Sequence, residues 1–320
     1  MLGGGFHMKK RIISLVALGI MTTGTIYLLN RLADYRADNK NILPMKGRFF
    51  TWREYDIFYN VKGSGSPIIL IHDLIPSASN YEWTKLIRRL ERNHTVYAID
   101  MIGCGRSDKP AITYTTYFYT EMIGSFIEKV IGEKTILIAS GMSAFPAIMT
   151  DRMYRDKVEK LILINPEKIS TAEIQPDRKS KLVKTIITLP IIGTYVFNIE
   201  TTEKNLFRLF RERFYMKPQL VDDRIVGAYY EAAHRGHGSG RYLLASLRGR
   251  FLNANIRAAL RELDNIVIIG SRDRKGMIPI QGEYKKYALK AETASVSGSK
   301  TLPQLEVPDK LAQVLHLFIE

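Results

Sequence analysis

The chain has 320 residues, a hydrophobic fraction of 46% and a formal net charge of +15, which is enough apolar content for one large core, with or without an added lid. Its single cysteine, Cys104, excludes an internal disulfide bond, so cysteine content does not indicate the redox compartment. The positive charge favours an anionic partner, and because no basic stretch carries interleaved aromatic residues, we expect a membrane surface and no nucleic acid.

An uncharged segment lies near the N-terminus, at residues 12–29. As a helix it would be about 27 Å long, close to the ~30 Å thickness of the bilayer hydrocarbon. We therefore predict a single-pass transmembrane anchor. The alternative is a cleaved signal peptide, but the segment is longer than a usual apolar signal region and no clear cleavage site follows. Lys9, Lys10 and Arg11 before it place the N-terminus in the cytoplasm and the main domain outside.

The residues after a polar linker at 30–46 alternate strand and helix patterns. Residues 47–62 predict two short strands around a turn, and Ile68–Ile71 is a continuous apolar run that is typical of a strand buried on both faces. Similar runs are Val96–Ile99, Ile136–Ile138, Leu161–Ile164 and Ile266–Ile269. Helical patterns lie at about 82–92, 115–131, 144–154 and 306–319.

This alternation predicts the α/β class, with a mostly parallel sheet covered by helices on both faces. Residues 167–250 interrupt it, since they contain no strand run and have a helical pattern, as an inserted lid would. Within them, residues 178–217 combine apolar runs with a basic face, which suits a cap over a pocket and also contact with anionic lipid. The predicted parts are a tail (1–11), the anchor (12–29), the linker (30–46), the core (47–166 and 251–320) and the helical lid (167–250).

A five-residue turn of small residues follows the third of the buried runs. It reads Ala139-Ser140-Gly141-Met142-Ser143 and leads into a helical pattern from Ala144. Strand, small turn and helix are the layout of a nucleophile elbow, in which the central residue carries the nucleophile in a strained backbone conformation. The central residue here is Gly141, which has no side chain.

Five other short motifs follow or precede predicted elements. They are His72-Asp73, the segment from Asp100 to Pro110, Asn165-Pro166, the segment from Gly270 to Asp273, and the segment from Leu302 to Pro308. With the elbow, and in this order, they resemble the α/β-hydrolase superfamily, in the branch of epoxide hydrolases, haloalkane dehalogenases and esterases. The segment Asp100–Pro110 is similar to that branch's D-x-x-G-x-G-x-S-D-K-P signature. The resemblance spans about residues 47–320 and implies an eight-stranded type of sheet, a hydrolase ancestry and no cofactor.

The resemblance also assigns positions to the catalytic triad, whose chain order is nucleophile, acid, histidine. The nucleophile position is Gly141 and the acid position is Asp273. The histidine position is Thr301, or Lys300 after a slip of one residue, and neither side chain is an imidazole base. The resemblance therefore implies a degenerate triad in which the acid alone is retained.

Two neighbouring hydroxyls and two histidines are the alternatives for a rearranged site. Ser140 and Ser143 flank Gly141, but an elbow exposes only its central residue. His234 and His237 could hang from the lid, although hydrogen-bonded imidazoles in a lid turn are the simpler interpretation. A metal site would need further acidic or cysteine ligands around them, so we predict none.

The oxyanion hole is expected at the loop that begins with His72-Asp73, where the family usually has His-Gly. Its donors would be the backbone N–H groups of about Leu74 and Met142, which do not depend on side-chain identity. Asp73 would add a negative charge beside an oxyanion hole, which itself binds a negatively charged oxygen. The alternative is that its carboxylate caps a turn.

These features predict a membrane-anchored protein of α/β-hydrolase fold that is catalytically inactive or strongly impaired and binds a small apolar ligand or a protein partner. An esterase-like hydrolase with a rearranged nucleophile and base is the first alternative. A structural, envelope-associated protein in which side chains fill the pocket is the second.

Overall fold

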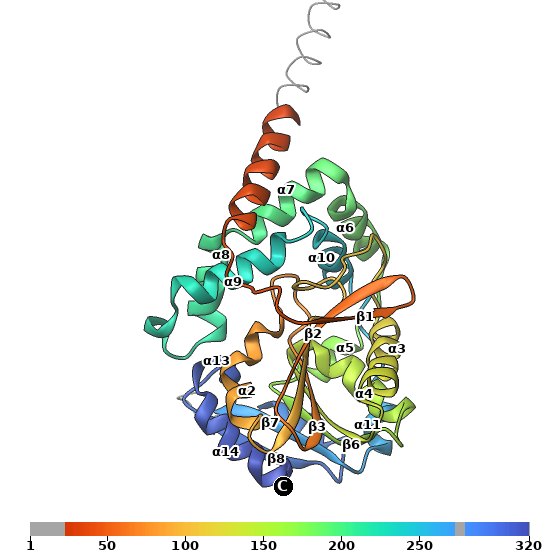
Figure 1. Cartoon of the computed structure of the whole chain (residues 1–320). Coiled ribbons are helices and arrows are strands. Elements are labelled where there is room, and N and C mark those ends of the chain that lie inside the picture. Colours follow the sequence, from red (N-terminus) through yellow and green to blue (C-terminus); the bar gives the residue numbers. More distant parts are fainter. Residues whose placement is uncertain (1–22, 273–278, 320) are drawn as a thin grey trace, which may run out of the picture.

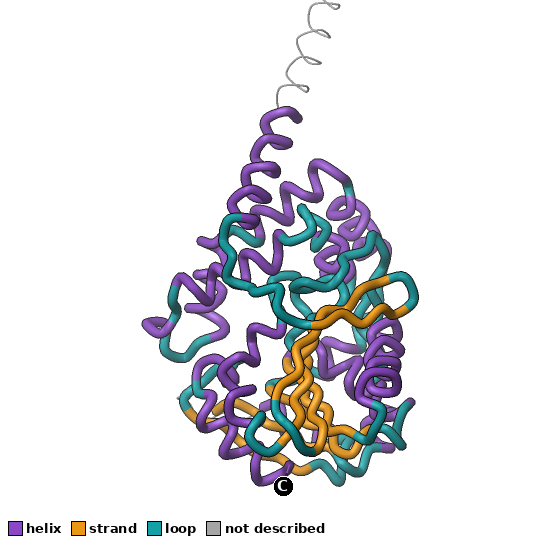
Figure 2. Tube along the Cα trace, in the orientation of Figure 1, coloured by secondary structure: helices purple, strands orange, loops and turns teal. Residues whose placement is uncertain are grey.

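A twisted layer of strands runs through the centre of the molecule (Figure 2). The computed structural model describes residues 23–272 and 279–319. In chain order, the strands there are β1 (Arg48–Trp52), β2 (Tyr55–Lys62), β3 (Ser66–Ile71), β4 (His94–Ile99), β5 (Thr135–Ser140), β6 (Val158–Ile164), β7 (Ile266–Arg272) and β8 (Glu292–Ser297). They form one eight-stranded sheet in the order β1-β2-β4-β3-β5-β6-β7-β8.

The sheet is mostly parallel, as predicted. β1 pairs with β2 and β2 with β4 in antiparallel fashion, whereas all pairs from β4 to β8 are parallel. Each of the five apolar runs lies within one of the strands β3 to β7, and residues 47–62 form the β1–β2 hairpin. The predicted α/β class and its sheet are therefore confirmed.

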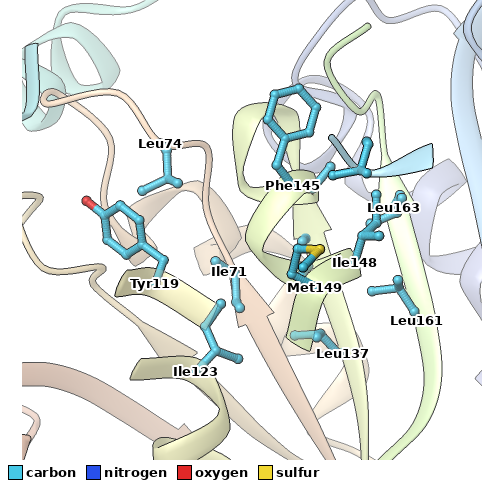
Figure 3. Close-up of a cluster of buried hydrophobic side chains, with 14 of the residues drawn as sticks. Ile71, Leu74, Tyr119, Ile123, Leu137, Phe145, Ile148, Met149, Leu161 and Leu163 are labelled. Atoms are coloured by element: carbon cyan, nitrogen blue, oxygen red, sulfur yellow. The ribbon is translucent and has the colours of Figure 1, made fainter. Parts of the chain in front are cut away.

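Alternate residues of the central strands enter two separate cores. Ile69 and Ile71 of β3 belong to one apolar cluster, whereas Ile68 and Leu70 belong to the other. Figure 3 shows the first cluster, in which Ile71 and Leu137 of the sheet lie near Tyr119, Phe145 and Ile148 of the covering helices. Burial on both faces explains why these strands read as continuous apolar runs.

Helices cover both faces of the sheet. The first cluster is covered by α3 (Thr116–Phe126, continued by a π-helical turn, Ile127–Ile131), α4 (Ala144–Met153), α11 (Arg257–Glu262) and α12 (Pro279–Lys285). The second is covered by a 3-10 turn (Asn80–Trp83), α2 (Thr84–Leu90) and α14 (Pro308–Ile319), with the short α13 (Pro303–Glu306) before α14. The four predicted helical regions are thus helical.

A helical region separates β6 from β7. After the short α5 (Ile169–Ala172) come α6 (Arg178–Thr188), α7 (Pro190–Glu200), α8 (Glu203–Leu209) with a π-helical turn (Phe210–Phe214), a 3-10 turn (Pro218–Leu220), α9 (Asp223–His234) and α10 (Arg241–Arg248). We call α6 to α10 the helical insertion. Figure 1 shows it at the end of the molecule opposite the C-terminus. That it acts as a lid stays a prediction.

The N-terminal helix of the described chain covers residues 23–38 and lies beside α7 and α9 (Figure 1). Its Asn30 side chain accepts a hydrogen bond from Asn198 of α7 at 3.0 Å, and Tyr230 of α9 donates to its Ala33 carbonyl at 3.0 Å. Further on, the backbone N–H groups of Ile42 and Leu43 donate to Glu231 of α9. The predicted linker therefore begins as a helix and is fastened to the insertion.

The predicted anchor at 12–29 falls mainly outside the described residues. Among residues 23–272 and 279–319, no single helix has the length and apolarity to cross a bilayer.

Several elements of the C-terminal part have no counterpart in the sequence pattern, among them α11, α12 and β8. β8 is an edge strand, and of its six residues only Val296 is buried. Without a buried face on both sides, it lacks the apolar run by which its parallel neighbours were predicted.

Candidate functional site

The candidate site lies where the loops after β3 and β5 meet. These strands are parallel neighbours in register, with Ile71 opposite Ala139, so both loops leave the same edge of the sheet. β3 pairs with β4 on its other side, which makes this edge the point where the chain's connections diverge. Ligand sites in open α/β sheets form at such switch points.

The turn after β5 has the backbone of a nucleophile elbow. Ser140 ends the strand, a single 3-10 turn (Gly141–Ser143) follows, and α4 begins at Ala144. Gly141 has a φ of +58°, the left-handed conformation that the central residue of an elbow adopts and that side chains other than glycine rarely do. The turn keeps this geometry although it holds no nucleophilic side chain at its centre.

The carboxylate of Asp73 fills the space above Gly141. A Cβ placed on Gly141 would lie within 2.7 Å of both carboxylate oxygens, which is inside contact distance. The Met142 N–H donates to Asp73 Oδ1 at 2.8 Å, and the Leu74 N–H lies near enough to this carboxyl group to lower its pKa slightly. These are the two N–H groups that the sequence predicts as oxyanion-hole donors, and the Asp73 carboxylate lies against them.

Burial raises the pKa of Asp73 to about 6. The nearby Glu167 adds to this rise, while the backbone N–H groups of Met142 and Leu74 oppose it because they stabilise the ionised form. At neutral pH the side chain is therefore mainly an anion, which accepts the Met142 N–H.

A second buried carboxyl group, Glu82, lies beside the first and was not expected from the sequence. Tyr229 donates to its Oε1 at 2.7 Å, and Gln304 and Ser140 donate to its Oε2 at 3.3 and 3.4 Å. The backbone N–H of Asp73 also donates to Oε2, at 3.3 Å. Burial, and then the charge of Asp73, raise the pKa of Glu82 to about 8, so Glu82 is mainly neutral at pH 7.

His72 and Ser143 are both engaged in structural hydrogen bonds. The Met101 N–H donates to His72 Nε2 at 3.0 Å, and His72 Nδ1 lies 2.7 Å from the Asp73 carbonyl, to which it donates. Because Nε2 accepts, the imidazole is neutral, and burial lowers its pKa. The Ser143 hydroxyl donates to the His72 carbonyl. Neither side chain is oriented as a nucleophile–base pair.

The position predicted for the histidine, Thr301, is held by the insertion. Its hydroxyl donates to the Arg213 carbonyl at 3.0 Å and its N–H to the Phe214 carbonyl at 3.1 Å. Asn165, after β6, donates to the Lys300 and Thr301 carbonyls at 2.9 and 3.0 Å. Asp273, the predicted acid, lies outside the described residues.

Aromatic side chains of the insertion pack above this edge of the sheet. Phe210, Phe214, Tyr215 and Tyr229 form one buried cluster with Leu302 and Leu305 around α13. Phe210 and Tyr229 meet edge to face with ring centroids 4.7 Å apart. This cluster fills the space next to Glu82 with protein.

The two histidines of the insertion make their contacts with residues outside the elbow. His234 Nδ1 lies 2.9 Å from the Tyr230 carbonyl, its Nε2 lies 3.4 Å from the Thr201 hydroxyl, and burial lowers its pKa to about 4. His237 is exposed and lies 3.4 Å from Asp38 of the N-terminal helix. In the described part of the chain, no group of three His, Cys, Asp or Glu side chains is placed to hold a metal ion.

The segment Asp100–Pro110, which follows β4 and resembles the family signature, forms a buried network of polar contacts. Asp100 pairs with Arg106 at 2.7 Å and accepts the Asn80 N–H at 2.6 Å, and the Arg106 charge holds the pKa of Asp100 low. A Cβ on Gly105, at a φ of +50°, would lie within 2.9 Å of both Asp100 oxygens. The aspartate and glycine of the signature therefore belong to one packed unit below the candidate site.

Comparison with known proteins agrees with this geometry. The profile of the family described as "Alpha/beta hydrolase family" matches residues 68–314. The chain belongs to the alpha/beta hydrolase family.

Several known proteins and solved structures are similar to this chain at low sequence identity. The chain is 24% identical over 229 residues to 2-hydroxy-6-oxo-6-(2'-aminophenyl)hexa-2,4-dienoic acid hydrolase of Metapseudomonas resinovorans, a match that covers 71% of this chain and 74% of the relative. The crystal structure of Cfl2 from Burkholderia cenocepacia is similar with a TM-score of 0.71 at 19% identity, covering 86% of this chain and 95% of that one. A crystal structure of a membrane phospholipase A has a TM-score of 0.67 at 19% identity, covering 97% and 98%.

Most of the site residues predicted from the sequence lie close together in the structure of this alpha/beta hydrolase family member. Gly141, Met142, Asp73 and Leu74 meet at the elbow, and Ser140 and Ser143 flank it. Glu82 is a site residue that carries no signal in the sequence, because it begins an amphipathic helical stretch in which one carboxylate is ordinary. Only the fold shows that this carboxylate faces inward.

Proposed function

We propose that this protein is a membrane-anchored member of the alpha/beta hydrolase family whose elbow does not catalyse hydrolysis and which serves as a binding protein. Its ligand is a small apolar or amphiphilic molecule, or a protein partner. The family membership and fold are established above. The inactivity, the anchoring and the binding role are the proposal.

The observation that carries the proposal is the position of Asp73. Its carboxylate accepts the Met142 N–H that would otherwise stabilise a substrate oxyanion, and it fills the space of a side chain on Gly141. A fixed anion in the hole opposes the negative charge that develops in acyl transfer. The site thus combines a missing nucleophile, a missing histidine at Thr301 and an occupied oxyanion hole.

Losing triad members lowers kcat by up to about 10⁶-fold in a serine hydrolase, and the oxyanion hole and substrate binding supply the residual rate. Here the oxyanion hole is also compromised. We therefore expect turnover of simple esters near the rate of the uncatalysed reaction.

The decisive experiment is labelling of the purified full chain with a fluorophosphonate probe, together with turnover of p-nitrophenyl esters. No labelling is expected under conditions that label an active esterase. Labelling or turnover of the unaltered protein at ordinary esterase rates would refute the inactivity.

A restoration series tests the role assigned to Asp73. Gly141→Ser with Thr301→His supplies a nucleophile and a base, but the new serine side chain collides with the Asp73 carboxylate. Adding Asp73→Gly removes the collision and frees the two N–H donors. We expect probe labelling to rise in the triple variant above the double variant, with Asp73→Gly alone as the control that lacks a nucleophile.

One observation favours the alternative of an active hydrolase with rearranged groups. Asp73 and Glu82 are two buried carboxyl groups whose pKa values, about 6 and about 8, lie on either side of neutrality, as in acid–base pairs. If the unaltered protein hydrolyses esters and Glu82→Gln or Asp73→Asn abolishes the activity while the fold is kept, the alternative replaces our proposal.

The anchoring is supported by the uncharged segment 12–29 and by the basic residues on either side of it. Carbonate extraction of membranes from cells that make the full chain measures it directly. We expect the protein in the membrane pellet, and protease accessibility of the main domain from the extracytoplasmic side. Release into the supernatant would remove the anchor from the proposal.

A further inference from the structure

A groove separates the N-terminal helix from the helical insertion. Its volume is about 840 Å³, within the range of small-molecule sites. Its lining includes Leu29, Leu32, Arg36 and Lys40 from the N-terminal segment and Ile199 and Lys204 from the insertion. It is separate from the elbow, whose residues are not among those that line it.

The two walls are held in place by specific hydrogen bonds. Asn30 donates to the Ile191 carbonyl at 3.2 Å and accepts from Asn198 at 3.0 Å, and Tyr230 donates to the Ala33 carbonyl at 3.0 Å. Asn30 and Asn198 are themselves buried. The groove is therefore a preformed feature of the fold.

One end of the groove is apolar and exposed. Leu29, Leu32 and Ile199 retain 46%, 43% and 45% of their accessible surface, although all three line the same hollow. Exposed aliphatic side chains that gather in a concave site mark a place where an apolar ligand or surface binds.

The other end is basic. Arg36, Lys40 and Lys204 line it, and Glu203 is the acidic residue among them. Lys40 pairs with Glu203 at 2.7 Å. Within the described residues, Arg36 and Lys204 pair with no carboxylate, so two positive charges face the groove uncompensated.

The two ends are arranged in a defined order relative to the predicted anchor. Leu29 closes the uncharged segment 12–29, and Arg36 lies seven residues further along the same helix, about 10 Å deeper into the protein side. The apolar end therefore adjoins the bilayer and the basic end lies beyond it. A membrane lipid has the same order of acyl chain and headgroup.

We infer that this groove binds one anionic phospholipid of the surrounding membrane, with its phosphate at Arg36 and Lys204 and an acyl chain along Leu29, Leu32 and Ile199. The inference deepens the proposed binding role and rests on the proposed anchoring. It assigns the ligand site to the junction of anchor and insertion, and not to the elbow.

The test uses the full chain, purified in detergent and exchanged until lipid-free. Phosphatidylglycerol or phosphatidylcholine is then added, and the retained lipid is counted by native mass spectrometry. We expect the protein to retain phosphatidylglycerol preferentially. Arg36→Gln with Lys204→Gln should lower this retention by about tenfold or more, since each basic residue near an anionic headgroup contributes a several-fold effect.

The matched control is Arg88→Gln with Arg92→Gln, which removes two exposed basic residues in and just after α2, outside both the groove and the insertion. Its lipid retention should equal that of the unaltered protein. The inference is overturned if Arg36→Gln with Lys204→Gln retains as much phosphatidylglycerol as the unaltered protein does. It is also overturned if the unaltered protein retains phosphatidylglycerol and phosphatidylcholine equally.

Carbonate extraction of the same variants keeps the two proposals apart. If the protein stays in the membrane pellet but the variant Arg36→Gln with Lys204→Gln retains as much lipid as the unaltered protein, the anchor stands and lipid binding in the groove is refuted. A protein released by carbonate that still binds phosphatidylglycerol through Arg36 and Lys204 refutes the anchor and supports the groove.

Discussion

Asp73 and Gly141 compete for one volume: the carboxylate of the first lies within 2.7 Å of where a Cβ on the second would be. The two residues are 68 positions apart in sequence and meet because β3 and β5 are parallel neighbours. In the family, an elbow side chain faces an open oxyanion hole. Here the Asp73 carboxylate takes that space, so a side chain at position 141 would collide with it.

This relationship predicts an unusually large cost for Gly141→Ala. Gly132 has a φ of +77° with nothing near its Cβ position, so Gly132→Ala should cost about 1 kcal/mol of backbone strain alone. Gly141→Ala adds overpacking against Asp73, which costs about 1–3 kcal/mol more. Chemical denaturation of both variants measures the difference. The excess should vanish in an Asp73→Gly background, and equal costs at the two glycines would contradict the packing.

Glu82 should make stability fall as pH rises. Its folded pKa of about 8 lies above the ordinary carboxyl value of 4.5, so between these pH values the unfolded chain is ionised while the folded chain must keep its proton. Stability from this group is full below about pH 4.5 and is lost progressively up to about pH 8. Glu82→Gln should therefore raise Tm at pH 8 relative to the unaltered protein and change it little at pH 4.5. Glu159→Gln, at an exposed position, is the control and should be neutral at both pH values.

The Asp100–Arg106 pair should be far more costly to break than a surface pair. Both side chains are buried, and removing one leaves an uncompensated internal charge. We expect Arg106→Met to cost about 3–5 kcal/mol of unfolding free energy. Arg152→Met breaks the exposed pair with Glu262 and should cost under about 1 kcal/mol. Urea titrations measure the free energy of unfolding of both variants. Equal decreases would show that the buried Asp100–Arg106 pair stabilises the fold no more than a surface pair does.

Asn165 should join the loop after β6 to the end of β7 and to the loop before α13. Its amide donates to Ser271 Oγ at 2.8 Å and to the Lys300 and Thr301 carbonyls, and its Oδ1 accepts the Ser271 N–H at 2.7 Å. Asn165→Ala removes all of these and should cost about 2–3 kcal/mol, because each lost partner contributes about 0.5–1.5 kcal/mol. Asn253→Ala loses two bonds in a more open setting and should cost about half as much. Thermal unfolding of both variants compares them, and a neutral Asn165→Ala would exclude the joining role.

The sheet was predictable because its signal is local. Ile68–Ile71 and Ile136–Ile138 are buried on both sides, so every residue in them is apolar and the strands stand out in the sequence. β8 escaped prediction for the opposite reason, since its edge position leaves most of its residues exposed and mixed in character.

The sequence positions of the candidate site residues could be predicted, but the contacts that their side chains make could not. Small residues around Gly141 indicate an elbow by themselves, but a carboxylate on the loop after β3 gives no sign of pointing into the oxyanion hole rather than capping its own turn. Glu82 depends even more on the fold, because its partners Tyr229 and Gln304 come from the insertion and from α13. Spacing along the chain carries no information on such contacts.

The contact between Glu231 and the segment before β1 also limits how far the chain can be truncated from its N-terminus. Its Oε2 accepts the Ile42 and Leu43 N–H groups at 2.7 and 3.0 Å, and its side chain is almost wholly buried. A chain shortened to begin at residue 47, just before β1, would leave that carboxylate with Arg235 as its remaining partner and would uncover the apolar side of α9. For α9, the folded unit therefore starts upstream of its first strand, and truncations meant for solubility need to keep residues 30–46.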